Sequence, residues 1–272
     1  MAKGVLAGHM AAGEGALRRH LRDVDILWEI CDARCPRTSR NPRLRRLAGT
    51  KARLLLLGKA DLAPEREVAA WVAALGAAGE RALAFDATSG RGMQRLWAMS
   101  AEAAGRPAGP LKAMVVGIPN VGKSTLLNRV GGRHRLATGA RPGVTRGPQW
   151  IETPAGRLLD LPGILAPRIA GAEEAWRLLA IGAVDEGALD PQIGAAALLA
   201  WIAAAAPRRL EERYGLGSEA GGGDLLLEAV AAARGMRAAG GVLDLERAAA
   251  TVLADFRRGN LGAIALEYPS TR

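Results

Sequence analysis

The segment Gly117 to Ser124, which reads GIPNVGKS, has the residue types and spacing of a loop that binds nucleotide phosphates. It matches the pattern G-x-x-x-x-G-K-[ST], in which glycines let backbone N–H groups turn toward phosphate oxygens at the start of a helix. Lys123 would meet the β and γ charges, and the Ser124 hydroxyl would be a ligand of Mg²⁺. The other nucleotide contacts expected from this loop are Asn120, Val121, Gly122 and Thr125.

Two shorter segments downstream follow in the order expected of a nucleotide hydrolase. Asp160 ends a short apolar run, and a carboxylate at a strand end can hold Mg²⁺ through water. The N–H of Gly163 would meet the γ-phosphate, and Thr145 would close over the metal. Each segment alone indicates only a turn. Together, after a phosphate loop, they predict a GTP-hydrolysing site in which Lys123, Thr145 and Gly163 take part in the reaction.

The base-reading segment lies upstream of the phosphate loop rather than downstream. Residues 54–61 (LLLLGKAD) form an apolar run that ends where the motif N-K-x-D is expected. Asp61 would accept hydrogen bonds from guanine N1 and N2, and the stem of Lys59 would lie along the base. The remaining expected base contacts are Gly58, Ala60, Asp86 and Ala87. Gly58 stands where the motif has Asn, which should weaken base binding by about 1 kcal/mol.

The elements that must position these segments alternate between strands and helices. Apolar runs bounded by Gly, Pro or Asp predict strands over 24–31, 53–57, 81–85, 113–116 and 157–159. Helical periodicity predicts helices over 15–22, 65–75, 93–104 and 123–130. This alternation predicts an α/β fold with a doubly wound, mostly parallel sheet. In such a sheet the sites at strand ends depend on strand order and not on where the chain begins, so a rotated order of motifs is allowed.

The strand pattern stops after residue 167. Long segments rich in Ala, Leu and Arg follow, separated by Gly-rich turns, and they indicate helices. We therefore expect two domains: residues 1–167 with the nucleotide-binding sheet, and residues 168–272 as a small all-helical domain.

Positive charge is concentrated near the N-terminus. The chain carries a net charge of +10, and residues 1–60 contain 13 Lys or Arg against 5 Asp or Glu. No acidic residue occurs from residue 33 to residue 60. We expect this stretch to contact a polyanion such as RNA through its phosphates, because no aromatic side chains for base stacking are interleaved. The alternative is an arginine-rich face exposed to solvent.

The composition excludes several classes of protein. With 49% apolar and 24% charged residues, the chain is neither fibrous nor disordered. The longest apolar stretch, residues 193–206, is too short to span a bilayer. The N-terminus does not read as a secretory signal, and Cys31 and Cys35 read as reduced thiols, so we expect a cytoplasmic protein.

The rotated motif order resembles that of the circularly permuted GTPases of the YlqF type, the ribosome biogenesis GTPase A family. The resemblance covers nearly the whole chain. It is carried by residues 32–36 (DARCP), 39–42 (SRNP), 143–146 (GVTR), 149–151 (QWI), 160–167 (DLPGILAP) and 255–262 (DFRRGNLG). The sequence departs from the family at residues 5–13 (VLAGHMAAG), where the family has W-F-P-G-H-M-x-K-A.

The resemblance implies a Mg²⁺-dependent enzyme that hydrolyses GTP to GDP and phosphate in late assembly of the large ribosomal subunit. Its implied partners are rRNA and ribosomal proteins, and the C-terminal helical domain would help to bind RNA. It also implies a K⁺ ion beside Asn120 and a water-orienting role for His9, whose alternative is a structural role. We expect a monomer without a membrane span.

The residue after Gly163 bears on the rate of hydrolysis. Many small GTPases carry a Gln there that orients the attacking water, whereas this chain has Ile164. We therefore expect slow turnover without a ribosomal partner. Two alternatives are an ATP-using phosphate-loop protein and an RNA-binding assembly factor that binds nucleotide with little or no turnover.

Overall fold

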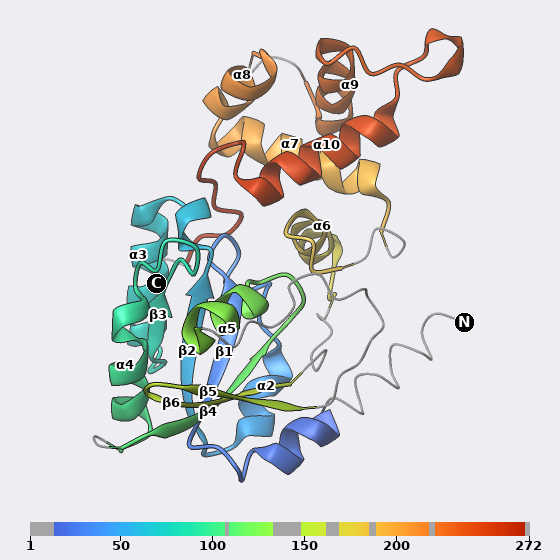
Figure 1. Cartoon of the computed structure of the whole chain (residues 1–272). Helices are drawn as coiled ribbons and strands as arrows, with labels where there is room; N and C mark the ends of the chain where they lie inside the picture. Colours follow the sequence, from blue (N-terminus) through green and yellow to red (C-terminus); the bar gives the residue numbers. More distant parts are fainter. Residues whose placement is uncertain are drawn as a thin grey trace. The chain divides into compact units, whose positions relative to one another are not determined.

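The computed structural model describes residues 14–106, 109–132, 148–161, 169–184, 189–217 and 221–269. The chain divides into two compact units (Figure 1). One is formed by Met1–Arg168 together with Glu267–Arg272, and the other by Ile169–Leu266. The first unit contains the sheet, and the second is built from helices in its described residues.

The first unit is built on a six-stranded sheet with the order β3-β2-β1-β4-β6-β5. Its strands are β1 (Ile26–Asp32), β2 (Ala52–Gly58), β3 (Ala82–Ala84), β4 (Leu111–Gly117), β5 (Gln149–Thr153) and β6 (Gly156–Asp160). Neighbouring strands run parallel except β5, which pairs antiparallel with β6. Most residues of β1, β2 and β4 are buried, which is typical of parallel strands covered on both faces.

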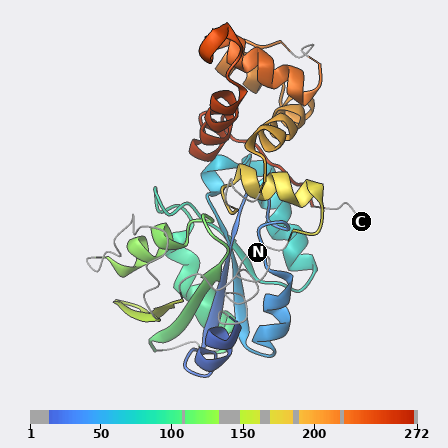
Figure 2. The same ribbon diagram turned by 90° about the vertical axis from the view of Figure 1, so that its right-hand side faces the viewer.

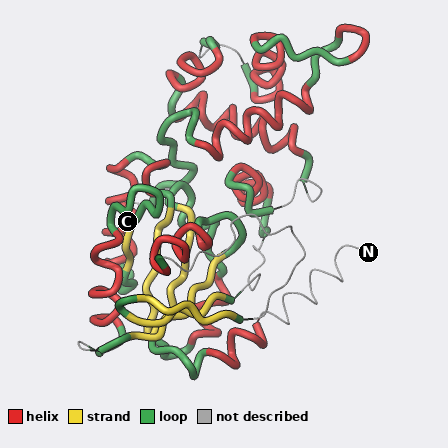
Figure 3. The backbone as a smooth tube through the Cα atoms, viewed as in Figure 1, coloured by secondary structure: helices red, strands yellow, loops and turns green. Residues whose placement is uncertain are grey.

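Helices cover both faces of this sheet, as Figures 2 and 3 show. Besides residues 14–20 they are α2 (Pro42–Ala48), α3 (Glu65–Ala77), α4 (Leu96–Ala103) and α5 (Lys123–Gly131), with 3-10 turns at Ala60–Leu62 and Met93–Arg95. On one face Trp71 of α3 packs in a buried cluster with Cys31 and Leu57. On the other, the buried indole of Trp28 donates its N–H to Ser100 Oγ of α4 at 2.9 Å.

The strand order places the expected site residues at one edge of the sheet. The chain runs from β1 outward to β2 and β3, and then places β4 on the other side of β1. The carboxyl ends of β2, β4 and β6 are Gly58, Gly117 and Asp160. In open parallel sheets ligands bind at the carboxyl ends, where the strand order reverses. The predicted α/β class with a doubly wound, mostly parallel sheet is confirmed.

The structure contains two elements that the sequence analysis does not predict. The strand β5 buries only Ile151 among its five residues, because it lies at the sheet edge, and so it lacks the apolar run of the central strands. The helix α2 begins with Asn41 as its N-cap, whose side chain accepts a hydrogen bond from Arg43 N, and with Pro42 in its first turn. At seven residues it is too short to show a periodic apolar pattern.

The second unit packs its helices around α7. In the described residues they are α6 (Ala172–Ala180), α7 (Pro191–Ala205), α8 (Arg208–Tyr214), α9 (Gly223–Ala233) and α10 (Leu245–Arg258), with a 3-10 turn at Ala239–Gly241. α7 contacts the other four helices. The rings of Trp176 and Trp201 lie 6.0 Å apart. Asp255 of α10 accepts hydrogen bonds from Arg213 and from the hydroxyl of Tyr214, so the DFRRGNLG segment has a structural role in this unit.

The second unit ends at Leu266, before the end of the helical domain that the sequence predicts for residues 168–272. Glu267 belongs to the first unit, where its carboxylate accepts hydrogen bonds from the backbone N–H groups of Arg37 and Thr38. These partners are about 230 positions apart in the chain. A local sequence pattern cannot reveal such a contact.

Much of the positive charge between residues 33 and 60 is used inside the first unit. Arg34 is 1% exposed and pairs with Asp32. Arg40 and Arg53 both meet the carboxylates of Glu29 and Glu80. These guanidinium groups neutralise carboxylates of the unit itself, and contact of the other arginines with RNA stays a prediction. The exposed arginines on or near the first two helices are Arg18, Arg19, Arg22, Arg43, Arg45 and Arg46.

Cys31 and Cys35 are free and buried, as expected of reduced thiols. Burial raises the pKa of both thiols well above the ordinary value for cysteine, so neither is a reactive nucleophile. Among the described residues, no helix combines the length and the apolar character needed to cross a membrane.

Candidate nucleotide-binding site

The phosphate loop joins the end of β4 to the start of α5. Asn120 has a φ of 61° and Gly122 a φ of 101°, so the loop takes the left-handed conformation twice before the helix begins. Left-handed turns of this kind form concave nests of backbone N–H groups that bind anions. Gly117 is required at the start of the loop, because a Cβ there would lie 2.8 Å from the Ile30 carbonyl oxygen of β1.

Lys123 and Asp160 meet beside this loop. Lys123 Nζ donates to Asp160 Oδ1 at 2.6 Å and to the Leu161 carbonyl oxygen at 3.1 Å. Ser124 and Thr125 follow in the first turn of α5 and are exposed. The structure therefore places the ammonium group beside the carboxylate, with the hydroxyl groups next along the helix.

A metal ion at this place would have few ligands from the protein. The described part of the chain contains no cluster of three or more His, Cys, Asp or Glu side chains that could hold one. The Ser124 hydroxyl and the Asp160 carboxylate are hard oxygen ligands, and phosphate oxygens and water would supply the rest. This donor set suits Mg²⁺, which keeps several waters and binds through one or two protein groups plus substrate phosphates.

The loop after β2 is tied to the phosphate loop by Lys59. Its backbone is left-handed, with a φ of 55°, and its Nζ donates to the Asn120 carbonyl oxygen at 2.5 Å. The loops lie close here, since a Cβ on Gly58 would lie 2.8 Å from the Val121 carbonyl oxygen. Asp61, two residues further on, is exposed. The two loops that the sequence assigns to base and phosphates therefore meet, although Lys59 and Asn120 are 61 positions apart.

Asp86 shapes the loop that follows β3. It is buried, and its carboxylate accepts hydrogen bonds from Thr88 N at 2.7 Å and Ser89 N at 3.0 Å. Burial alone would raise the pKa of Asp86, but these hydrogen bonds hold it below its ordinary value. The loop adjoins the one after β2, because Ala60 N donates to the Phe85 carbonyl oxygen at 3.2 Å. Because the carboxylate is bound to backbone N–H groups of its own loop, a base contact here would come from the loop backbone.

The structure adds to the site a buried ion pair that the sequence analysis does not predict. Asp32 ends β1, and Arg34 binds it with two hydrogen bonds, Nε to Oδ1 at 2.9 Å and Nη2 to Oδ2 at 2.8 Å. Lys59 Nζ lies 3.4 Å from Asp32 Oδ2. Burial opposes the charged carboxylate, but Arg34 and Lys59 outweigh it and lower the pKa of Asp32. The available signal was its position: like Asp160, Asp32 directly follows buried strand residues.

Of the expected site residues, hydrogen bonds thus join Lys59 to Asn120 and Lys123 to Asp160. His9, Thr145 and Gly163 lie outside the described residues, so their expected roles stay predictions.

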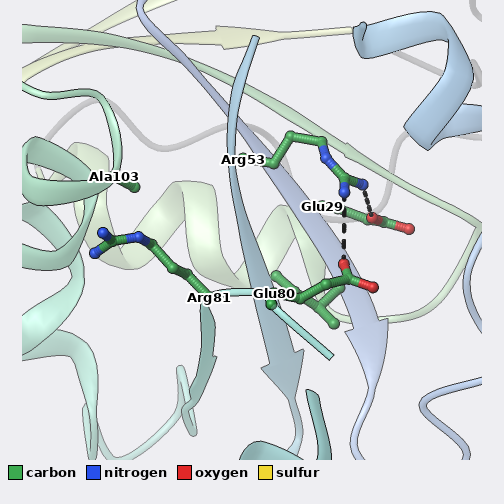
Figure 4. A pocket seen from close by; sticks show the side chains of 7 residues that line it. Glu29, Arg53, Glu80, Arg81 and Ala103 are labelled. Atoms are coloured by element: carbon green, nitrogen blue, oxygen red, sulfur yellow. Dashed lines mark ion pairs between the residues drawn. The ribbon is translucent and has the colours of Figure 1, made fainter. Parts of the chain in front are cut away.

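A cavity of about 220 Å³ lies elsewhere on the sheet (Figure 4). Its lining includes Glu29 and Arg53 from the strands, and Glu80 and Arg81 before β3. Arg53 lies 3.6 Å from both carboxylates, and Arg40 hydrogen-bonds to both. Because Arg53 and Arg81 lie at the amino ends of β2 and β3, the cavity is separate from the nucleotide loops, and its charges neutralise one another.

We expect the substitution Gly58→Ala to weaken nucleotide binding. The added methyl group would meet the Val121 carbonyl oxygen, so the phosphate loop would have to shift. Overpacking of this kind costs about 1–2 kcal/mol, which corresponds to a loss of roughly tenfold in affinity for GDP. Gly76→Ala is the matched control, because Gly76 lies in α3 with no atom within 4 Å of the added Cβ. Fluorescent GDP titration measures both variants, and unchanged affinity in Gly58→Ala would show that this close approach does not matter.

Comparison with known proteins agrees with this geometry. The 50S ribosome-binding GTPase family matches residues 112–189, which include the phosphate loop and Asp160. Ribosome biogenesis GTPase A from Priestia megaterium is 35% identical in an alignment that covers 97% of this chain and 96% of that protein. Mitochondrial ribosome-associated GTPase 1 from Xenopus tropicalis is 31% identical in an alignment that covers 96% of this chain and 93% of that protein.

Solved structures give the same result. The crystal structure of GNP-bound YlqF from T. maritima superposes with a TM-score of 0.67 at 25% identity, over 93% of this chain and 98% of that chain. The resemblance drawn from the rotated motifs is confirmed, and so is the circularly permuted fold. This chain belongs to the ribosome biogenesis GTPase A family, a family of GTP-hydrolysing enzymes that act in ribosome assembly.

Proposed function

We propose that this protein binds GTP and Mg²⁺ at the carboxyl edge of its sheet, hydrolyses GTP to GDP and phosphate, and acts in late assembly of the large ribosomal subunit through rRNA and ribosomal proteins. The observation that carries the proposal is the 2.5 Å hydrogen bond from Lys59 to Asn120, which joins a base-reading loop to a phosphate loop. The names of its relatives support the ribosomal role.

The base would be read beside the loop after β2. The exposed carboxylate of Asp61 can accept hydrogen bonds from N1–H and the N2 amino group of guanine. Adenine does not offer this pair of donors. Lys59 would flank the base, with the backbones of Gly58 and Ala60 and of the loop that begins at Asp86 and Ala87.

The phosphates would lie over the first turn of α5, in contact with the loop residues from Asn120 to Thr125. Lys123 supplies positive charge, while Ser124 and Asp160 supply oxygen ligands for Mg²⁺, which when bound would neutralise charge on the β- and γ-phosphates. The Lys123–Asp160 pair supports this assignment, because it holds these two groups beside the loop at 2.6 Å. We place K⁺ beside Asn120 on the resemblance to the family.

Hydrolysis would be slow in the isolated protein, because Ile164 cannot orient water where many small GTPases have Gln. In this proposal the N–H of Gly163 meets the γ-phosphate, Thr145 closes over the metal, and His9 orients the water. A ribosomal partner would raise the rate by completing the site.

RNA would be met by exposed arginines of the first unit. Arg18 and Arg19 belong to the helix at residues 14–20, and Arg45 and Arg46 to α2. The two helices adjoin, because Arg43 pairs with Glu14 at 3.2 Å. Phosphates are the natural partners of such a group. We propose that the protein acts as a monomer in the cytoplasm.

We expect Asp61→Asn to reverse the preference between guanine and xanthine nucleotides. Hydrogen bonds to a charged group contribute about 1.5–3 kcal/mol, so affinity for GDP should fall by roughly 10- to 100-fold. Affinity for XDP should rise, because the amide NH₂ can donate to the O2 of xanthine. Asp23→Asn serves as the control, since its side chain is 54% exposed and pairs with His20 on the surface. An unchanged preference in Asp61→Asn would remove Asp61 from the base site.

Phosphate release from the full chain tests the proposed reaction. We expect slow release from GTP alone and faster release with purified large ribosomal subunits, with higher rates in K⁺ than in Na⁺. Equal thermal stabilisation by GTP and ATP would favour an ATP-using protein instead. No GTP turnover under any of these conditions would leave an RNA-binding assembly factor that only binds nucleotide.

The RNA surface is tested through salt dependence. We expect the double variant Arg45→Ala with Arg46→Ala to bind large-subunit rRNA more weakly, and to reduce the slope of log K against log salt concentration by about 1.5 to 2, because each phosphate contact releases a counterion. Lys112→Ala, which removes an exposed charge from β4, should leave the slope unchanged. A flat salt dependence of the unaltered protein would mean that these arginines form a solvated face.

A further inference from the structure

Glu267 is a buried carboxylate at the point where the chain leaves the second unit. It is 6% exposed and directly follows Leu266, the last residue of that unit. Its Oε2 accepts a hydrogen bond from Arg37 N at 2.8 Å, and its Oε1 accepts from Thr38 N at 3.1 Å and from the Thr38 hydroxyl. Its own carbonyl oxygen accepts from Trp71 Nε1 at 3.2 Å. Three donors from one short loop therefore converge on this carboxylate.

The loop that Glu267 holds turns back onto Asp32. Thr38 is followed by Ser39, which is fully buried. The hydroxyl of Ser39 accepts a hydrogen bond from Asp32 N at 2.8 Å and donates to the Cys35 carbonyl oxygen at 2.7 Å. The position of Thr38 thereby restrains the end of β1.

Asp32 in turn restrains the nucleotide loops. Its carboxylate lies 3.4 Å from Lys59 Nζ, and the same ammonium group donates to the Asn120 carbonyl oxygen at 2.5 Å. A continuous series of polar contacts therefore runs from Glu267 through the loop after β1 to Lys59 and the phosphate loop. All of its members belong to the first unit.

We propose that Glu267 is a positioning residue for the bound nucleotide. It touches neither the base nor the phosphates, but it fixes the loop that sets Asp32 and, through Asp32, the ammonium group of Lys59. The second unit is covalently joined to the first at this residue, so a partner that engages the second unit gains a route to nucleotide affinity through the contacts of Glu267. The proposal rests on GTP binding at the site described above.

The decisive measurement is the rate of GDP release from the full-length protein and from Glu267→Gln. The Gln side chain keeps the size of Glu but loses the charge and directs an NH₂ group at donors. We expect release to be roughly five- to tenfold faster, because charge-assisted hydrogen bonds restrain the loop. Glu102→Gln is the matched control, since its carboxylate is 69% exposed in the same unit. The thermal midpoint of each variant without nucleotide is recorded as well.

A second variant tests the route. Thr38→Val removes the hydroxyl at nearly the same volume and should also speed release, whereas Thr38→Ser should restore the normal rate. The double variant with Glu267→Gln should be no faster than Glu267→Gln alone, since both changes break one contact. Thr38→Val carries the test if Glu267→Gln does not fold.

The outcomes separate the two proposals. Failure of the unaltered protein to bind GDP would overturn the proposed function. Normal binding by the unaltered protein, with a lower thermal midpoint but unchanged GDP release in both Glu267→Gln and Thr38→Val, would overturn this inference and leave Glu267 as a structural contact. Fully additive effects of the two substitutions would also overturn it.

Discussion

The site depends on one hydrogen bond between loops of two strands that are not neighbours in the sheet. Lys59 follows β2 and Asn120 follows β4, and β1 lies between those strands. The ammonium group must therefore reach across the end of β1, over a place that is partly closed to water. Burial lowers the pKa of Lys59, and the carboxylate of Asp32 opposes that shift and favours the charged form. Asp32 at the end of β1 is therefore as necessary to the joined site as the lysine itself.

The need of buried carboxylates for a positive partner also explains why the number of arginines and lysines near the N-terminus overestimates the positive charge on the surface. Arg34 pairs with Asp32, and Arg40, together with Arg53, neutralises the carboxylates of Glu29 and Glu80. Removing one partner of a buried pair leaves an uncompensated charge, at a cost of about 3–5 kcal/mol. These arginines are therefore required by the fold. The charge available to a polyanion lies on two short helices, the one at residues 14–20 before β1 and α2 after it, in residues such as Arg18 and Arg45.

The sequence predicts those parts of the molecule whose signal is local. The run before Gly58 and the spacing from Gly117 to Ser124 mark a strand and a phosphate loop, because burial and phosphate binding each impose a pattern on consecutive residues. The pairing of Arg40 with Glu80 and of Thr38 with Glu267 imposes no pattern on consecutive residues, since the partners are 40 and 229 positions apart. For the same reason Asp86 reads as a base contact in the sequence, whereas its hydrogen bonds to Thr88 and Ser89 give it the task of shaping its loop.

The permuted order of the chain also determines how the helical unit is attached. Residues 169–266 are inserted between the end of β6, where Asp160 lies, and Glu267, which is bound to the loop after β1. A unit joined by a single linker can reorient without straining the domain that carries it. A unit inserted within the chain is tied to the first unit at both of its ends. Here the first point of attachment follows Asp160 in the sequence, and the second, Glu267, binds the loop after β1 whose contacts lead through Asp32 to Lys59. In a chain with the usual motif order, the base-reading strand would follow the strand that carries Asp160, so it would lie in the sequence between that strand and a C-terminal helical unit. The rotation thus attaches the helical unit, in the sequence, after the strand that carries Asp160 and, at Glu267, to the loop whose contacts lead to Lys59.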